Sequence, residues 1–204
     1  MVNHLISMHD LDRRKIIRLL KLTKKIKKHP KKYKNKLEGK NLLMLFAKPS
    51  LRTRLSFEIA MLKLGGHAIF YDIANSTLGK KESIKDFALV ISRYFNCIMA
   101  RVYEQKDLEE LAKFSQVPVI NGLSNREHPC QALSDLFTIK EKFGRLKKLD
   151  IAYIGDANNN VTHSLIIICN ILGLDITISS PNKKEFLPDN SVIGEAEYFY
   201  EKEP

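Results

Sequence analysis

The chain has 204 residues, of which 44% are hydrophobic and 28% charged, with 34 Lys and Arg against 23 Asp and Glu. These values are typical of globular proteins and exclude a wholly disordered or collagen-like chain. Its three cysteines, Cys97, Cys130 and Cys169, lie far apart, which argues against a disulfide framework and a zinc site and favours a cytoplasmic protein. The longest apolar run, residues 165–174, is shorter than the ~20 residues that a bilayer requires, so we expect neither a signal peptide nor a membrane span.

The positive charge is concentrated near the N-terminus. Residues 13–40 contain 14 Lys and Arg and one acid, Glu38, whereas the remainder has 20 basic and 22 acidic residues. Within residues 11–28, apolar residues such as Ile16 and Leu20 recur at helical spacing opposite the basic residues. We predict a docked amphipathic helix with a solvated lysine face. A patch for nucleic acid or an anionic membrane is the alternative, although no recognition motif follows.

Strand and helix patterns alternate along the rest of the chain. Strands are predicted at residues 41–47, 68–73, 97–102, 117–120, 149–154 and 175–179. Helices are predicted between Pro49 and Gly65, at residues 84–95, 107–115, 129–142 and 161–172, and from about Asp189. This alternation predicts an α/β fold with two doubly wound parallel-sheet domains. We place the boundary within the helix at 129–142, giving a first domain at residues 1–133 and a shorter second domain at residues 134–204.

The run KPSLRTRLSFE, residues 48–58, lies where a predicted strand ends and a predicted helix begins. The first amides of a helix lack intrahelical partners, and the helix dipole favours an anion there. Ser50 can cap the helix and donate its hydroxyl, Thr53 can donate another, and Arg52 can make a bidentate contact. The run therefore predicts an oxyanion-binding loop. For Arg54, a surface ion pair with the acid four residues later is as consistent as a ligand contact.

Three motifs together resemble the aspartate and ornithine carbamoyltransferase family. SLRTRLSFE is similar to the family's carbamoyl phosphate loop, and MARVY at residues 99–103 and HPCQ at residues 128–131 follow in the family's order and spacing. NGLS at residues 121–124 is similar to the ornithine branch, whereas the aspartate branch usually has an N-A-G-D-G type segment there. The resemblance covers essentially the whole chain and favours the ornithine branch, with aspartate carbamoyltransferase as a weaker alternative.

The resemblance implies transfer of the carbamoyl group from carbamoyl phosphate to the δ-amine of L-ornithine, giving citrulline and phosphate in arginine metabolism. It implies no cofactor and no covalent enzyme intermediate. We expect no metal site either, because His163 and Cys169 have no metal-like partner at a sensible spacing and are assigned to packing. The enzyme's tasks are then to neutralise the phosphate, polarise the carbonyl and align the amine. It also implies a homotrimer with active sites near the subunit interfaces, and no nucleic-acid or membrane partner.

The matched motifs also imply the site residues. The resemblance assigns carbamoyl phosphate to Ser50, the backbone amide of Leu51, Arg52, Thr53, Arg101, His128 and Gln131, with Arg101 and His128 as catalytic residues, and ornithine to Asn159. Arg101 falls at the carboxyl end of a predicted strand, where open α/β sheets bind ligands. For two of these residues a purely structural role stays open as the alternative to ligand binding. His128 precedes Pro129 at a helix start, and Asn159 can cap the next helix.

The sequence departs from the family pattern in two places. The family usually carries Gln or His two residues before the Gly of an L-G motif, reaching carbamoyl phosphate in the neighbouring subunit. That position is Thr77 here, which has a shorter reach, and Lys80 or Lys81 could compensate. The family's distal D-x-W-x-S-M-G and H-C-L-P motifs have no counterpart, because the chain has no Trp and no His followed by Cys.

These departures predict a second domain that is incomplete at its C-terminus and an amino-acid site that lacks residues. The chain is then either a fragment of a longer product or a shortened relative. We expect it to form citrulline at or near background. The alternative function is a non-catalytic carbamoyl phosphate-binding or subunit-interaction protein derived from the family.

Overall fold

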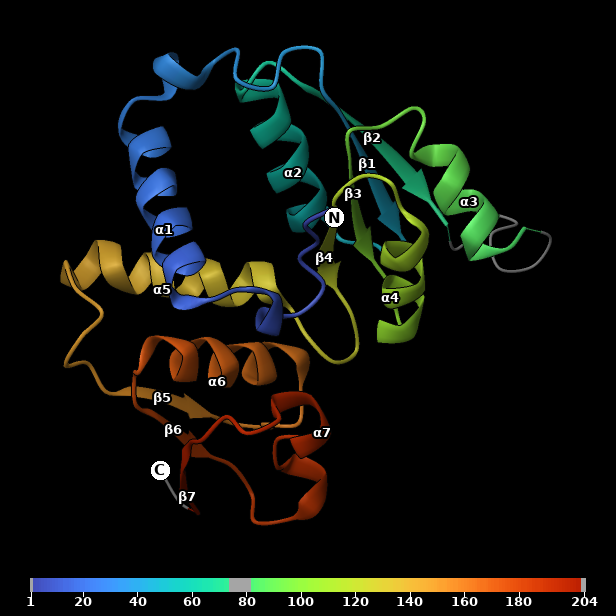
Figure 1. Ribbon diagram of the computed structural model, residues 1–204. Coiled ribbons are helices and arrows are strands. Elements are labelled where there is room, and N and C mark those ends of the chain that lie inside the picture. The colour runs from blue at the N-terminus through green and yellow to red at the C-terminus, as the bar shows by residue number, and fades with distance from the viewer. Residues whose placement is uncertain (1, 74–81, 203–204) are drawn as a thin grey trace. The chain divides into compact units, whose positions relative to one another are not determined.

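A computed structural model describes residues 2–73 and 82–202 and divides the chain into two compact units (Figure 1). Unit 1 comprises Met1–Ile6 and Lys21–Ser124, and unit 2 comprises Ser7–Leu20 and Asn125–Pro204. Helix α1 (Arg13–Lys28) contributes its first half to unit 2 and its second half to unit 1. In the described ranges, no helix is both long and apolar enough to cross a membrane.

Four parallel strands form the sheet of unit 1 in the order β2-β1-β3-β4. The strands are β1 (Asn41–Phe46), β2 (His67–Asp72), β3 (Cys97–Arg101) and β4 (Val119–Leu123). In β1, every residue after Asn41 is buried. A strand covered on both faces reads as a continuous apolar run, which explains the NLLMLF sequence.

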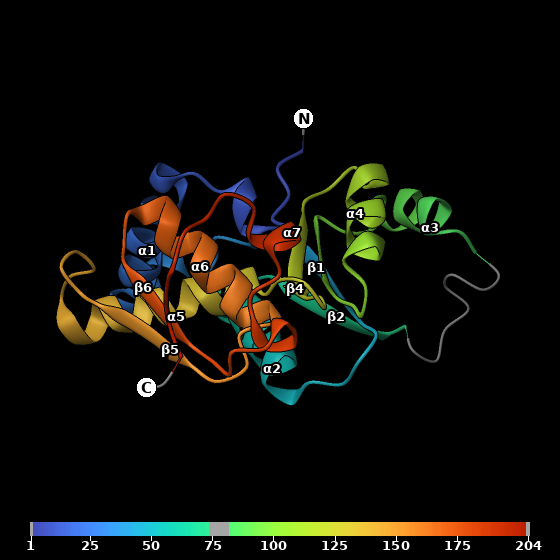
Figure 2. The same ribbon diagram turned by 90° about the horizontal axis from the view of Figure 1, so that it is seen from below.

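Helices cover both faces of this sheet (Figure 2). They are α2 (Leu51–Lys63), α3 (Ile84–Ile91) and α4 (Gln105–Phe114), and the 3-10 turn η2 (Pro30–Tyr33) precedes β1. On one face, Phe57 and Met61 of α2 pack against the cluster that contains Met44. On the other face, Leu108 of α4 shares a cluster with Leu45. The predicted α/β class with a doubly wound parallel sheet is confirmed.

The N-terminal residues of unit 1 extend its sheet beyond β4. The N–H of Leu5 donates to the carbonyl of Val119 at 2.9 Å, and the N–H of Asn121 donates to the carbonyl of Leu5 at 2.7 Å. The side-chain amide of Asn121 also donates to the carbonyl of Ile6 at 2.8 Å. These bonds cover an edge that would otherwise expose unpaired backbone groups.

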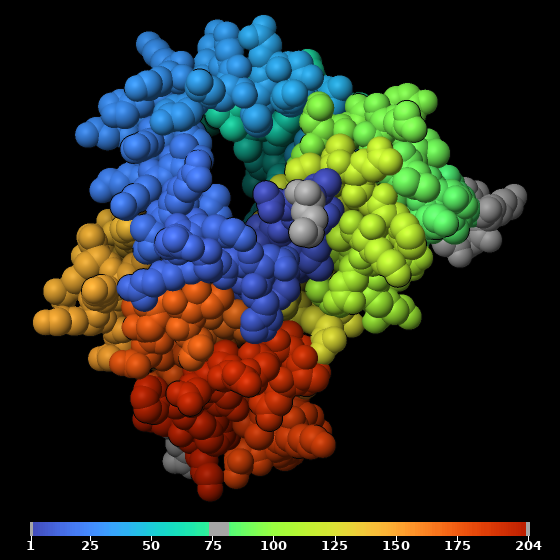
Figure 3. Space-filling model, viewed as in Figure 1, coloured from blue at the N-terminus to red at the C-terminus, as the bar shows by residue number. Residues whose placement is uncertain are grey.

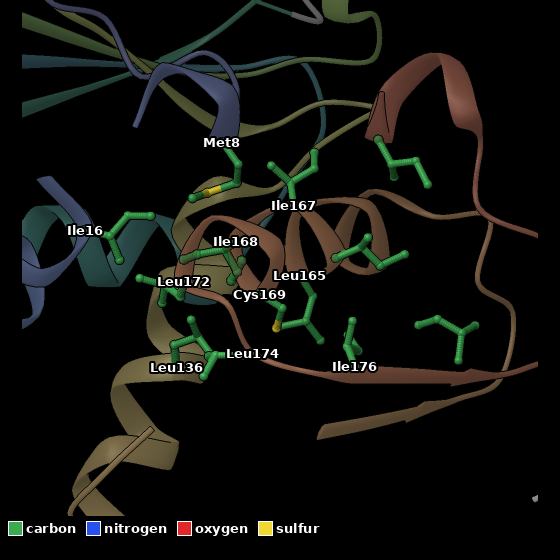
Figure 4. Packing of buried hydrophobic residues seen from close by; sticks show 14 of the residues in the cluster. Met8, Ile16, Leu136, Leu165, Ile167, Ile168, Cys169, Leu172, Leu174 and Ile176 are labelled. Atoms are coloured by element: carbon green, nitrogen blue, oxygen red, sulfur yellow. The ribbon is translucent and has the colours of Figure 1, made fainter. Parts of the chain in front are cut away.

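Unit 2 contains a three-stranded parallel sheet in the order β5-β6-β7. Its elements are η1 (Met8–Asp10), α5 (Pro129–Phe143), β5 (Ile151–Ile154), α6 (Asn160–Leu172), β6 (Ile176–Ser179), η3 (Lys184–Phe186), α7 (Asn190–Ile193) and β7 (Phe199–Glu201). Helix α6 is the centre of the core, where Ile168 and Leu172 lie among Met8, Ile16 and Leu136 (Figure 4). This near-complete burial is why α6 is apolar around most of its circumference.

Some element bounds differ from the prediction. Strand β4 was predicted at residues 117–120 but runs from Val119 to Leu123. Its second half contains Asn121 and Gly122, which are not typical strand residues, and its register is irregular there. Strand β7 was missed, since three residues are too few to show an alternating pattern. The contacts group the whole of α5 with unit 2, and the domain boundary at residue 133 stays a prediction.

Candidate functional site

Helix α2 begins shortly after the carboxyl end of β1, with Ser50 as its N-cap. The Oγ of Ser50 accepts the N–H of Thr53 at 3.4 Å and donates to the Oγ1 of Thr53 at 3.0 Å. The predicted helix cap is therefore confirmed. Leu51 and Arg52 are exposed in the first turn, where helix amides lack intrahelical acceptors. Two hydroxyls, a guanidinium and first-turn amides thus come together at one positive helix end.

Arg101 is the last residue of β3 and pairs in register with Phe46 at the end of β1. Its carbonyl accepts the N–H of Ala47 at 2.9 Å, which fixes its backbone beside the chain that leads into α2. Partial burial lowers the pKa of Arg101. The buried Nε of Arg101 has no acceptor within the part of the chain that the structure describes. A buried guanidinium N–H without an acceptor is costly, and an anion would satisfy it.

Lys48 is a second cation at this place, and it was not among the predicted site residues. Its Nζ lies 4.9 Å from the centroid of the Tyr103 ring. Partial burial and the neighbouring charge of Arg101 lower the pKa of Lys48. Within the described residues, neither Lys48 nor Arg101 forms an ion pair with a carboxylate. The only sequence signal was the position of Lys48 between a buried strand and a capped helix.

The sheet has an irregular register beside Arg101. Ala100 pairs with Asn121 and Arg101 pairs with Leu123, so Gly122 is the extra residue on β4. A Cβ built at Gly122 would lie 2.4 Å from the Sδ of Met99 and 3.2 Å from the carbonyl oxygen of Ala100. Only glycine fits this close approach without displacing a neighbour. Bulges of this kind commonly re-aim a side chain at a functional edge.

For Arg54, the structure shows the surface ion pair. Its Nε donates to the Oε1 of Glu58 at 2.8 Å, and its guanidinium lies 4.2 Å from the centroid of the Phe70 ring. Both partners belong to unit 1 and satisfy the guanidinium without a ligand. Arg54 thus differs from Arg101, whose Nε has no such acceptor in the described ranges.

In unit 2, His128 is the N-cap of α5 and Pro129 is its first residue. The N–H of His128 donates to the Oγ of Ser164 at 2.9 Å, and that hydroxyl lies 3.3 Å from the Oε2 of Glu127. The same carboxylate oxygen accepts the N–H of Met8 at 2.9 Å. The helix-start position of His128 is confirmed, and a buried network fixes its backbone.

The other two predicted residues of unit 2 are occupied by local contacts. The Nε2 of Gln131 donates to the Oδ1 of Asp135 at 2.9 Å. Asn159 caps α6, because its Oδ1 accepts the N–H of Val161 at 2.9 Å and that of Thr162 at 3.0 Å. The capping interpretation of Asn159 is therefore the one observed. Its proposed contact with ornithine stays a prediction. Thr77, Lys80 and Lys81 lie outside the described residues, so their proposed roles also stay predictions.

A separate groove of about 640 Å³ lies in unit 1 between the end of α1 and α2 (Figure 3). Its lining is mostly apolar and includes Ile26, Pro30, Leu55 and Ile59. None of the predicted ligand-binding residues lines it. The candidate anion site therefore lies at the strand ends and not in this groove.

Two family models match the chain. The first, described as the aspartate/ornithine carbamoyltransferase carbamoyl-P binding domain, matches residues 3–141. The second, described as the Asp/Orn binding domain of the same family, matches residues 147–203. The chain belongs to the aspartate/ornithine carbamoyltransferase family. Its capped helix start and Arg101 both fall within the carbamoyl-P binding match.

Individual family members give the same result. The chain is 43% identical over 196 residues to an ornithine carbamoyltransferase of Shewanella oneidensis, covering 96% of this chain and 64% of that protein. It is 47% identical over 190 residues to one of Methanocaldococcus jannaschii, covering 93% and 61%. The structure of the Pyrococcus furiosus ornithine carbamoyltransferase matches at 44% identity with a TM-score of 0.91, covering 98% of this chain and 66% of that one. The chain thus spans less than two thirds of these curated family members.

Proposed function

We propose that the chain binds carbamoyl phosphate at the start of α2. We propose further that this is the carbamoyl phosphate site of an ornithine carbamoyltransferase. The observation that carries the proposal is the closeness of two cations, Lys48 and Arg101. Two partly buried cations lie close enough to affect each other and have no carboxylate partner among the described residues. They flank a helix N-terminus that itself favours an anion. A phosphate dianion is the ligand that relieves all three features together.

In this proposal the phosphate is held by the hydroxyls of Ser50 and Thr53, the amide of Leu51 and the guanidinium of Arg52. Arg101 contacts both a phosphate oxygen and the carbonyl oxygen. Charge-assisted hydrogen bonds of this kind are about twice as strong as neutral ones. They also stabilise the charge that develops on the carbonyl and on the departing phosphate in the transition state.

The proposed reaction requires no cofactor. The δ-amine of ornithine attacks the carbonyl carbon, a C–N bond forms, the bond from carbon to the phosphate oxygen breaks, and the proton lost by the amine passes to the departing phosphate. His128 and Gln131 would bind the carbamoyl group, and Asn159 would hold the α-carboxylate and α-amine of ornithine. Asn159 would then have to exchange part of its present bonding, since its Nδ2 donates to the Oη of Tyr153 at 2.9 Å. Thr77 would take the position from which the family usually reaches a neighbouring subunit.

We further propose a homotrimer that acts in arginine biosynthesis in the cytoplasm, with the sites near subunit interfaces. These 204 residues contain no Trp and no His-Cys pair, so the family's distal substrate motifs are not among them. We therefore propose that this chain alone binds carbamoyl phosphate but forms citrulline at or near background. The same observation favours a second candidate, a non-catalytic carbamoyl phosphate-binding protein derived from the family.

Isothermal titration with carbamoyl phosphate tests the binding step. The Arg101→Gln variant should bind about 10- to 100-fold more weakly, the loss expected for a charge-assisted contact. Arg54→Gln is the matched control, because Arg54 already pairs with Glu58, and its affinity should stay close to that of the parent chain. No binding by the parent chain, or equal losses in both variants, would refute the proposal.

A colorimetric citrulline assay tests catalysis separately. The chain should give background citrulline with ornithine at saturating carbamoyl phosphate. Robust turnover would show that these residues hold a complete amino-acid site. Carbamoylation of aspartate in place of ornithine would assign the aspartate branch. The non-catalytic candidate would be favoured by three results together: carbamoyl phosphate binding, a trimer on light scattering, and no citrulline formation even by a chain extended with any further coding sequence.

A further inference from the structure

His163 lies in the first turn of α6 and is 3% exposed. Its Nδ1 lies 2.9 Å from the carbonyl oxygen of Arg126, and its Nε2 lies 3.0 Å from the backbone nitrogen of Asp189. One imidazole therefore joins two segments that are far apart in the sequence. Arg126 lies two residues before His128, and Asp189 is the N-cap of α7.

These two bonds fix the protonation state of the ring. A backbone N–H can only donate, so the Nε2 of His163 must carry the lone pair that accepts the N–H of Asp189. A carbonyl can only accept, so Nδ1 must carry the proton. The imidazole is therefore neutral with its proton on Nδ1. An imidazolium would direct a second N–H at the amide of Asp189 and break that bond.

The segment held by Asp189 borders the loop before α6. The carbonyl of Phe186 accepts the N–H of Ala157 at 3.0 Å, and the carbonyl of Glu185 accepts the side-chain amide of Asn158 at 3.2 Å. Residues 185–193 thus contact the loop that ends at Asn159. The Nε2 of His163 bonds this segment at Asp189, and its Nδ1 bonds the backbone at Arg126, two residues before His128.

We propose that His163 is a positioning residue whose neutral imidazole binds the Asp189 and Arg126 backbones to α6, and that its protonation breaks the bond to Asp189 and loosens residues 185–193. This role rests on the proposed function in one respect: the segments that His163 positions adjoin His128 and Asn159, which bind substrate only in that proposal. The contacts themselves need no ligand.

The charges around the ring decide when the release occurs. Burial is the largest effect and lowers the pKa of His163, and the positive charge of Arg126 acts in the same direction. The bond to the Arg126 carbonyl and the negative charges of Asp189 and Glu127 oppose this shift. His9 of η1 also contacts α7, with its Nε2 3.2 Å from the carbonyl oxygen of Val192. Because the pKa lies below its ordinary value, the contact is closed at neutral pH and opens in acid.

Further contacts hold Asp189 and the turn that follows it. The Oδ1 of Asp189 accepts the N–H of Ser191 at 2.8 Å. The Nη2 of Arg126 donates to the carbonyl of Ser191 at 3.0 Å and to its Oγ at 2.6 Å. None of these three bonds involves the imidazole. They would persist when His163 is protonated, so we expect local loosening and not unfolding of unit 2.

Hydrogen exchange of the whole chain, read by mass spectrometry at pH 7.5 and 5.0 and corrected for intrinsic rates, tests this role. Peptides covering residues 186–194 should exchange faster at pH 5.0, and the difference should approach about tenfold as His163 becomes protonated, the factor for losing one ordinary hydrogen bond. In His163→Gln, the side-chain amide can accept from Asp189 and donate to Arg126 at either pH, so the difference should disappear. His9→Gln is the matched control and should retain it.

A pH difference that persists in His163→Gln, or that is absent in the parent chain, would overturn the proposal. If His163→Gln does not fold, nitrogen NMR of the parent chain decides. An unprotonated Nε2 at pH 7.5 supports the role, and a protonated Nε2 contradicts it. Carbamoyl phosphate titration of the same samples keeps the two proposals distinguishable, since loss of binding with an intact pH effect would count against the function alone.

Discussion

The Oγ of Ser164 accepts the backbone N–H of His128 at 2.9 Å. Ser164 is fully buried in α6, and its hydroxyl also reaches the buried carboxylate of Glu127. One small side chain therefore links the core helix of unit 2 to the residue at the start of α5. The position of His128 depends on this link and not on α5 alone.

Ser164→Ala should lower the free energy of unfolding by about 1–3 kcal/mol, because it removes the acceptor of a buried N–H and one donor to Glu127. Chemical denaturation measures this loss. Ser134→Ala is the control, since Ser134 is exposed and its hydroxyl donates to the carbonyl of Cys130 in its own helix. Its effect should stay below about 0.5 kcal/mol. Equal losses would show that the Ser164 network contributes nothing specific.

Lys48→Gln should weaken carbamoyl phosphate binding by about 3- to 10-fold without lowering stability. The substitution removes one attraction for the anion but also removes the repulsion between Lys48 and Arg101 in the free chain. Titration and denaturation of the same variant separate the two effects. Added salt should narrow the affinity difference, because screening weakens the partly exposed charge. A less stable variant with unchanged affinity would contradict this account of the two cations.

Gly122→Ala should destabilise unit 1 by about 1–3 kcal/mol, because the new methyl group would overlap Met99 and crowd the carbonyl of Ala100. A double-mutant cycle with Met99→Ala identifies the cause. Shortening Met99 removes the closest atom, so the two losses should fall short of additive by about 1 kcal/mol. Strict additivity would mean that the glycine is needed for backbone conformation and not for space.

The three thiols should resist alkylation at pH 8. Burial raises the pKa of Cys97 and Cys130 to about 11 and that of Cys169 to about 12. Since the thiolate is the reactive form, iodoacetamide should modify the native chain slowly and Cys169 slowest, whereas all three should react in denaturant. Mass spectrometry of timed samples measures the rates. Rapid modification of Cys169 in the native chain would contradict its burial.

The sign of the pH effect on stability follows from His163. Its folded pKa lies below the ordinary 6.5, so below that pH the unfolded chain binds a proton that the folded chain resists. The contribution of His163 to stability is therefore present above pH 6.5 and declines as the pH falls. Denaturation midpoints measured from pH 7.5 to 5.0 should decrease, and they should decrease less in His163→Gln.

The sequence by itself determined the features that depend on local chemistry. Ser50 caps α2 and Pro129 begins α5, because the unsatisfied amides of a helix start select such residues in any context. The continuous apolar run of β1 similarly followed from burial of a parallel strand on both faces. The matching family motifs could be read for the same reason, since each lies within a few consecutive residues.

Only the tertiary structure decided which distant residues meet. Lys48 lies beside Arg101 because β1 and β3 are neighbours in the sheet, and strand order is not encoded in any local pattern. The structure likewise showed that Gly122 is a bulge residue packed against Met99. His163, assigned from sequence to packing alone, proved to join Arg126 and Asp189, because buried polar groups must find partners and those partners come from other segments.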